Sequence, residues 1–111
     1  MNKIISCFLI SALAGIPAVF ATGNYGYESA YTATTISGYT YADPDSCSVT
    51  IKGTCLSNNG GSLAYPTASG TKDPVTKQAT AYKSLPSGYQ YYTRVEGTHK
   101  VGKNTYYTAH P

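Results

Sequence analysis

The most constraining feature of this sequence is a strict alternation of residue types between residues 47 and 55. Apolar or small residues occupy the odd positions of this run, and polar residues occupy the even ones. Such a period of two places successive side chains on opposite faces of a β-strand. No segment after residue 21 shows the 3.6-residue period of a helix. The pattern therefore predicts an all-β domain.

The composition beyond residue 21 favours a sheet in which tyrosine replaces aliphatic side chains. That region has nine Leu, Ile and Val residues, no Phe or Trp, and all twelve Tyr. A tyrosine buries about 150–250 Å², and Tyr and Thr both favour strands, so we expect a folded domain despite the few aliphatics. Seven Lys or Arg against five Asp or Glu leave a charge near +2. This charge is too small to predict a nucleic acid or an anionic lipid as partner.

Turn-forming residues divide the region into antiparallel strands. The expected turns lie at residues 43–46, 86–88 and 102–104, which contain Pro, Gly, Asp, Asn or Ser. The corresponding hairpins would pair 38–42 with 47–51, 77–85 with 89–96, and 98–101 with 105–109. We therefore expect a small antiparallel β-sandwich or partly open barrel of about five to seven strands.

The first 21 residues have the layout of a cleaved export signal. Lys3 precedes a largely apolar run, and small residues permit cleavage after Ala21. A membrane anchor is the alternative, but the run contains Pro17 and is shorter than the about 20 residues that span a bilayer. We expect a helical signal peptide, one exported domain at residues 22–111 and no membrane span in the mature chain. The destination would be extracellular, or periplasmic in a Gram-negative source.

Cys47 and Cys55 are the two cysteines of the expected mature chain. A cysteine pair in an exported protein suggests one disulfide. In one straight strand, however, the two residues would lie about 26 Å apart, whereas a disulfide needs Cα atoms within about 7 Å. Either the strand folds back near Lys52-Gly53 and the disulfide forms, or the strand is continuous and it does not. We favour the disulfide, because exported thiols tend to be oxidised.

No residue pattern indicates catalysis or a bound metal. Asp43 and Asp45 lie close together, but their Pro-containing context explains them as turn residues. His99 and His110 lack the spacing of zinc ligands, and no nucleophile motif marks a Ser–His–Asp hydrolase. Glycine-rich loops without a following helix give no phosphate site. We therefore expect a protein that is not an enzyme and that has no catalytic residue, cofactor or metal.

Aromatic and basic residues on the expected outer faces are the positive signal of function. If the hairpins form as expected, alternation turns six such residues outward: Tyr39, Tyr41, Lys52, Tyr82, Tyr92 and Arg94. Tyrosine is enriched at binding surfaces, because it offers rigid area with one polar tip. The alternative is structural, with the rings covering one another across a flat sheet or lying between two sheets.

Three short strings carry a resemblance to a known family. They are Gly26-Tyr27-Glu28-Ser29-Ala30-Tyr31, Ser48-Val49-Thr50-Ile51 and Gly102-Lys103-Asn104-Thr105-Tyr106-Tyr107. With these strings the chain resembles the lactococcin-type bacteriocins, which are small secreted β-sandwiches. It departs from them in lacking Trp near the start and in the middle, and in having two cysteines. The resemblance implies an antibacterial protein that acts outside the target cell on cell-wall precursor assembly, and it assigns no site residue.

Two functional hypotheses follow. The leading one is a small exported non-enzymatic β-sandwich whose Tyr-rich faces bind at or beyond the cell envelope, with an envelope component or a glycan as partner. The alternative is a secreted bacteriocin that interferes with cell-wall assembly of related bacteria. The sequence does not identify the partner itself.

Overall fold

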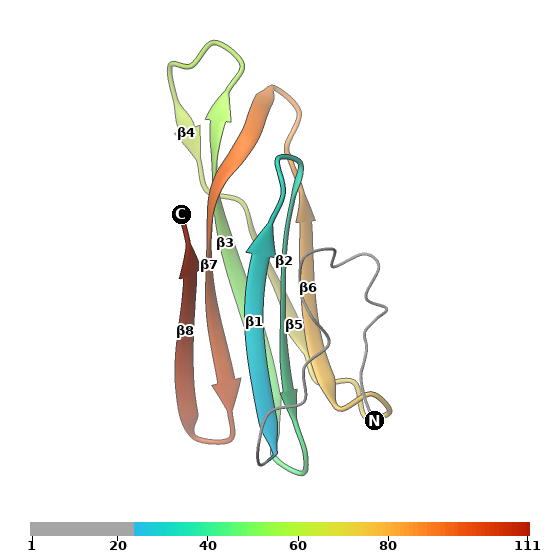
Figure 1. The fold of residues 1–111 in the computed structure, drawn as a ribbon. Coiled ribbons are helices and arrows are strands. Elements are labelled where there is room, and N and C mark those ends of the chain that lie inside the picture. Colours follow the sequence, from blue (N-terminus) through green and yellow to red (C-terminus); the bar gives the residue numbers. More distant parts are fainter. Residues whose placement is uncertain (1–23) are drawn as a thin grey trace.

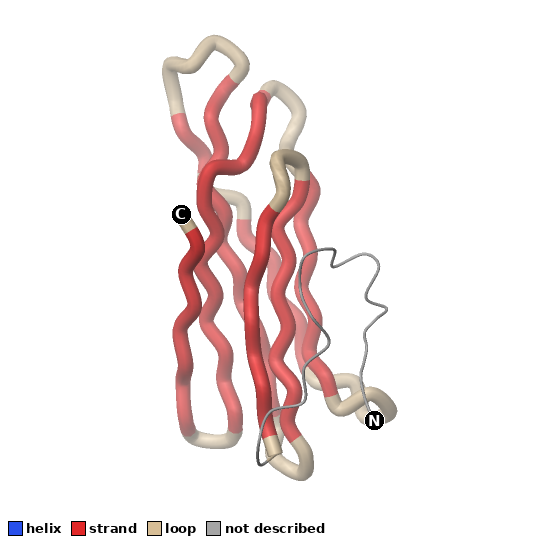
Figure 2. Tube along the Cα trace, in the orientation of Figure 1, coloured by secondary structure: helices blue, strands red, loops and turns tan. Residues whose placement is uncertain are grey.

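The computed structural model describes residues 24–111, so the expected signal peptide at residues 1–21 lies outside the described residues. The described chain is all-β, as predicted, and Figure 2 shows strands and loops but no helix in this part of the chain. The strands are β1 (Tyr25–Tyr31), β2 (Thr35–Ala42), β3 (Cys47–Ser57), β4 (Leu63–Ala64), β5 (Thr67–Thr71), β6 (Gln78–Ser84), β7 (Tyr89–Val101) and β8 (Asn104–His110). These eight strands exceed the expected number by one.

The strands form two antiparallel sheets that pack face to face (Figure 1). The three-stranded sheet has the order β1-β2-β6. The five-stranded sheet has the order β4-β3-β7-β8, and β5 pairs with β3 further along the same edge as β4. The long strands β3 and β7 form the centre of this second sheet. The fold is thus the small antiparallel sandwich that the sequence predicted.

Two of the three expected hairpins are wrong, because their strands belong to opposite sheets. β2 pairs with β1 and β6, whereas β3 pairs with β4, β5 and β7. Residues 43–46 therefore carry the chain from one sheet to the other, and residues 85–88 do the same between β6 and β7. Alternation predicts which side chains of a strand point into the core. It does not predict the sheet in which the neighbouring strands lie, because a strand of either sheet can bury the same face. The third hairpin is confirmed, since β7 pairs with β8 from Val101 and Asn104 onward.

The core lies between the sheets and consists mostly of small and β-branched side chains. The odd-numbered residues of β3 are buried from Cys47 to Cys55, as the alternation predicted. They pack against inward-facing side chains of the other strands, including Ile36, Ala42, Ala79, Ala81, Tyr92, Val95 and Val101. A Cβ added to Gly38 would lie 2.6 Å from Ile51 Cγ2. The sheets thus come so close at this point that only glycine fits.

The two sheets are joined differently along their two sides. On one side the backbones of β5 and β6 touch, because a Cβ on Gly70 would lie 2.0 Å from the carbonyl oxygen of Thr80. The Asp73 N–H also donates to the Gln78 carbonyl at 2.9 Å in the connecting turn. On the other side, side chains connect β1 to β8. The sandwich is therefore nearly closed on one side, as in a partly open barrel.

Candidate functional site

Cys47 and Cys55 are both free, so the expected disulfide is wrong. Both lie on β3, which continues past Gly53 without folding back. An extended strand keeps residues at this spacing about 26 Å apart, well beyond the reach of a disulfide. Both thiols face the core, and burial raises the pKa of each. Since the thiolate is the reactive form, burial makes both side chains weak nucleophiles.

Tyr92 is a core residue, so its expected outward position is wrong. Its ring packs among the buried residues between the sheets, and its hydroxyl donates to the Ser84 carbonyl at 3.1 Å. Burial raises the pKa of Tyr92 to about 12. The cause is a β-bulge, because the register between β3 and β7 shifts at Thr54 and Cys55. One extra residue in β7 turns the side chains of Tyr91 and Tyr92 to the opposite face, until a second register shift between Leu56 and Ser57 reverses the orientation again.

The other three predicted tyrosines belong to the outer side of the three-stranded sheet. Tyr39 points outward as predicted, but it is buried there against Ala30 and Tyr41. Tyr41 is half-buried, and its pKa is raised by burial and by the charge of Asp43. Tyr82 is exposed. The structure therefore separates these rings from Lys52 and Arg94, which lie on the other sheet.

The outer side of the five-stranded sheet carries three exposed rings that the sequence did not single out. Tyr65, Tyr91 and Tyr107 are 56%, 41% and 73% exposed. The register of β7 with its neighbours turns Tyr91 and Tyr107 away from the core, and Lys52 lies over the ring of Tyr65. Lys52 and Arg94 share this surface. We call these five residues the tyrosine face.

Two ion pairs join Lys52 and Arg94 of the tyrosine face to Glu96. The Nζ of Lys52 lies 3.3 Å from one oxygen of Glu96, and an Arg94 nitrogen lies 3.2 Å from the other. These two cations lower the pKa of Glu96, with the Arg94 hydrogen bond as the largest cause. The Lys52 nitrogen also lies 5.8 Å from the centre of the Tyr65 ring, within cation–π range. Exposed pairs add little stability, but here they keep Lys52 and Arg94 next to each other through Glu96, with Lys52 beside an exposed ring.

Hydroxyl groups lie on the same outer side as these rings and charges. The register of β5, β3 and β7 places six hydroxyl side chains on the same outer side: Ser48, Thr50, Thr67, Ser69, Thr71 and Thr98. Thr50 and Ser69 hydrogen-bond each other across the strands at 3.2 Å. The surface thus combines aromatic area with rows of hydrogen-bonding groups, which is the chemistry that polyhydroxylated ligands require.

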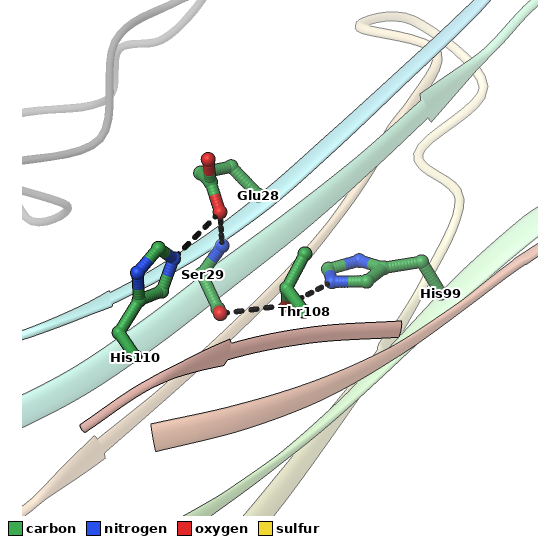
Figure 3. Close-up of polar contacts among 5 residues, drawn as sticks. All are labelled: Glu28, Ser29, His99, Thr108 and His110. Carbon is green, nitrogen blue, oxygen red and sulfur yellow. Dashed lines mark hydrogen bonds and ion pairs between the residues drawn. The ribbon is translucent and has the colours of Figure 1, made fainter. Parts of the chain in front are cut away.

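A second polar cluster connects β1 with β8 on the side of the sandwich where these edge strands meet (Figure 3). His110 Nε2 lies 2.9 Å from Glu28 Oε1, and the hydroxyls of Ser29 and Thr108 are 2.7 Å apart. The Thr108 hydroxyl is also 2.9 Å from Nε2 of His99. We call these five residues the seam. They form a chain of contacts from an exposed ion pair to a fully buried ring.

His99 occupies the inner end of the seam and is fully buried. Its Nδ1 lies 2.9 Å from the Thr40 hydroxyl, so both ring nitrogens have threonine partners. Burial lowers the pKa of His99 to about 4, although a hydrogen bond that the ring donates to the Tyr39 backbone and the charge of Glu28 oppose this shift. A Ser–His–Asp triad has a carboxylate on one ring nitrogen and an accessible nucleophile on the other. The seam therefore fits a structural role, in which hydrogen bonds join the two sheets, better than that of a catalytic centre.

No protein-family model matches the chain, and no curated protein matches its sequence. Among residues 24–111, no group of three or more His, Cys, Asp or Glu side chains could hold a metal ion. The same residues include no helix that is long and apolar enough to cross a membrane. The candidate functional surfaces of the described residues are the tyrosine face and the seam.

Proposed function

We propose that this protein is a small exported, non-enzymatic β-sandwich that binds a glycan of the cell envelope through the tyrosine face. The observation that carries the proposal is the outward exposure of Tyr65, Tyr91 and Tyr107 on one side of one sheet. Exposed tyrosine rings are typical of binding surfaces. The C–H faces of sugar rings pack against aromatic rings, while sugar hydroxyls can bond the Thr and Ser hydroxyls between them.

The shape of the tyrosine face favours an extended polymer over a small molecule. Small-molecule sites are concave and enclose most of their ligand, whereas this surface is the outer side of a sheet. Tyr107 lies on β8, and Tyr65 follows β4 at the opposite edge of the sheet. Adjacent strands are about 4.8 Å apart, so these rings are separated by roughly 15 Å across the sheet. That span matches a few consecutive sugar units.

Removing two rings of the tyrosine face tests the proposal. The purified wild-type protein should sediment with insoluble envelope glycan, either cell-wall sacculi or a β-1,4-linked polysaccharide. The double substitution Tyr65→Ala and Tyr107→Ala should weaken this binding at least about tenfold, because truncating an aromatic anchor of an interface can cost more than 1 kcal/mol. Both side chains are exposed, so the fold should survive, as circular dichroism would verify.

Tyr82→Ala is the matched control for this experiment. Tyr82 is also exposed, but it lies on the opposite sheet, so its removal should leave glycan binding unchanged. An equal loss of binding in the Tyr82 variant would contradict the proposal, because it would show that binding does not depend specifically on the tyrosine face. Failure of the wild-type protein to bind any envelope glycan would reject the proposed function itself.

The second candidate function is that of a secreted bacteriocin. Two of the three strings that carry the resemblance form β1 and β8, and these strands lie together through the contact of Tyr27 with Tyr106. Two of the strings thus belong to one structural unit of this fold. Growth inhibition of related Gram-positive bacteria by the purified mature protein tests this function, and no killing at micromolar concentration would exclude it.

A further inference from the structure

Three tyrosine rings from the two sheets lie against one another beside His99. The Tyr106 ring of β8 stacks on Tyr27 of β1 with centroids 4.9 Å apart, and on Tyr25 of β1 at 5.2 Å. Both pairs are nearly parallel, with an interplanar angle of 15°. The Tyr27 ring also contacts the His99 ring at 5.1 Å. This aromatic cluster extends the seam along β1 and β8.

The rings of Tyr25 and Tyr106 are stacked neighbours, with centroids 5.2 Å apart and an interplanar angle of 15°. Hydrogen bonding to the Tyr25 side chain is the largest cause that raises the pKa of Tyr106. Because the two rings are stacked, radicals formed on Tyr25 and Tyr106 would lie within reach of each other. Both side chains are half-buried and not enclosed, so a diffusible or enzymatic oxidant can reach the phenols.

We propose that Tyr25 and Tyr106 form an oxidative cross-linking site, at which a peroxidase and hydrogen peroxide join the two rings into dityrosine. The bond would connect β1 to β8 and close the seam covalently. Cys47 and Cys55 are free, so no disulfide connects the two sheets within the described residues. The inference rests on the aromatic cluster and is independent of the glycan proposal.

The proposed reaction balances with hydrogen peroxide as the oxidant. Each phenol gives up its O–H hydrogen as one proton and one electron, which produces two tyrosyl radicals. Their unpaired electrons combine in one carbon–carbon bond between the Cε atoms beside the two oxygens. Each of these carbons then returns its proton to its own oxygen, which restores two phenols. Hydrogen peroxide takes up two protons and two electrons and becomes two water molecules, so the protein loses two hydrogen atoms.

Proximity gives this pair its selectivity over more exposed tyrosines. Tyr65 and Tyr107 are the more accessible rings, but neither is stacked on another tyrosine within residues 24–111. A radical on either of them therefore couples only after an encounter with a second molecule. Tyr25 and Tyr106 already hold each other in contact, which replaces that bimolecular encounter by an intramolecular one.

The test is to treat the dilute purified protein with a haem peroxidase and hydrogen peroxide and to analyse the monomer. We expect dityrosine fluorescence, a mass lower by two hydrogen atoms, and one linked peptide pair that contains Tyr25 and Tyr106. Tyr25→Phe and Tyr106→Phe keep a ring in the stack but lack the phenolic hydrogen, so each should abolish the intramolecular product. Tyr107→Phe, one residue further along β8, should leave its yield unchanged.

Three results would overturn the proposal. The monomer could keep its mass while dimers accumulate, the linked peptides could contain other tyrosines, or the Phe variants could cross-link as the wild-type protein does. A product that joins Tyr27 to Tyr106 also contradicts the assignment to Tyr25. Near-ultraviolet circular dichroism checks that each variant is folded, and the peptide map of the wild-type protein decides the question if one of them is not.

Discussion

His99 shows how a single polar residue is accommodated in a core with few large aliphatic side chains. The imidazole fills space between the sheets, and hydroxyls of Thr40 and Thr108 approach its two nitrogens at 2.9 Å. A buried polar group that loses its partner costs about 1–3 kcal/mol, so these side chains depend on one another. In the sequence, His99 is one of several polar residues in its strand. Its environment in the fold depends on Thr40 and Thr108, which lie 59 and 9 positions away along the chain.

The buried state of His99 predicts that stability depends on pH. Its pKa is 6.5 in the unfolded chain and about 4 in the folded protein. Between these values the unfolded chain binds more protons than the folded protein. The free energy of unfolding therefore has its full value above about pH 6.5 and decreases as the pH falls toward 4. The expected loss is up to about 3 kcal/mol. Urea unfolding at a series of pH values measures it.

Two variants assign this dependence to His99. His99→Gln cannot titrate in this range, so its stability should change much less between pH 6.5 and 4. His110→Gln should behave as the wild-type protein does, because the ion pair of His110 with Glu28 is solvent-exposed and contributes little. A wild-type stability that is constant across this range would contradict the neutral buried state of His99.

β7 shows how an irregularity within one element changed the candidate site. The bulge opposite Thr54 and Cys55 sends Tyr92 into the core and Tyr91 to the surface, the reverse of what unbroken alternation predicts. A bulge changes the pairing of a strand but not its residue types, so the sequence alone could not reveal it. The β7–β8 hairpin was predictable, because Gly102 adopts a positive φ of 57° in a two-residue turn.

Gly70 of β5 allows a test of the close approach between β5 and β6. A Cβ here would lie 2.0 Å from a backbone oxygen of β6, and backbone cannot rotate away as a side chain can. Gly70→Ala should therefore lower the free energy of unfolding by about 2–4 kcal/mol. Gly61→Ala is the control, since its Cβ would meet the Asn59 side chain at 3.1 Å, and should cost under about 1 kcal/mol. Equal urea midpoints for the two variants would contradict the close approach of β5 and β6.

The whole molecule depends on contacts that join its two sheets at their edges. β5 meets β6 through backbone, whereas β1 meets β8 through the seam and the aromatic cluster. The interior between them has few large aliphatic side chains, so edge contacts matter more than in a larger domain. The tyrosine face lies on the outer side of the five-stranded sheet, where it takes no part in joining the sheets. Stability and the proposed binding therefore use separate sets of tyrosines.

Thr108→Val tests the seam at this scale. The substitution keeps the shape of the side chain but removes the hydroxyl that approaches both His99 and Ser29. Those two groups are buried, so the variant should lose about 1–3 kcal/mol of stability. Thr105→Val changes an exposed residue of the same strand and should stay within about 0.5 kcal/mol of the wild-type protein. Calorimetry on both variants measures the difference, and equal melting temperatures would show that the seam contributes nothing.

Local interactions along the chain determined the fold class of this protein, and tertiary structure determined which residues share its candidate site. Alternation in β3, the Tyr and Thr composition and the turn at Gly102 depend on neighbours in the chain, so the sequence predicted an antiparallel sandwich and the buried face of β3. Strand partners, the bulge in β7 and the free state of Cys47 and Cys55 depend on residues far apart in the chain. The sequence therefore identified Lys52 and Arg94, but the packing of two sheets decided that Tyr65, Tyr91 and Tyr107 accompany them.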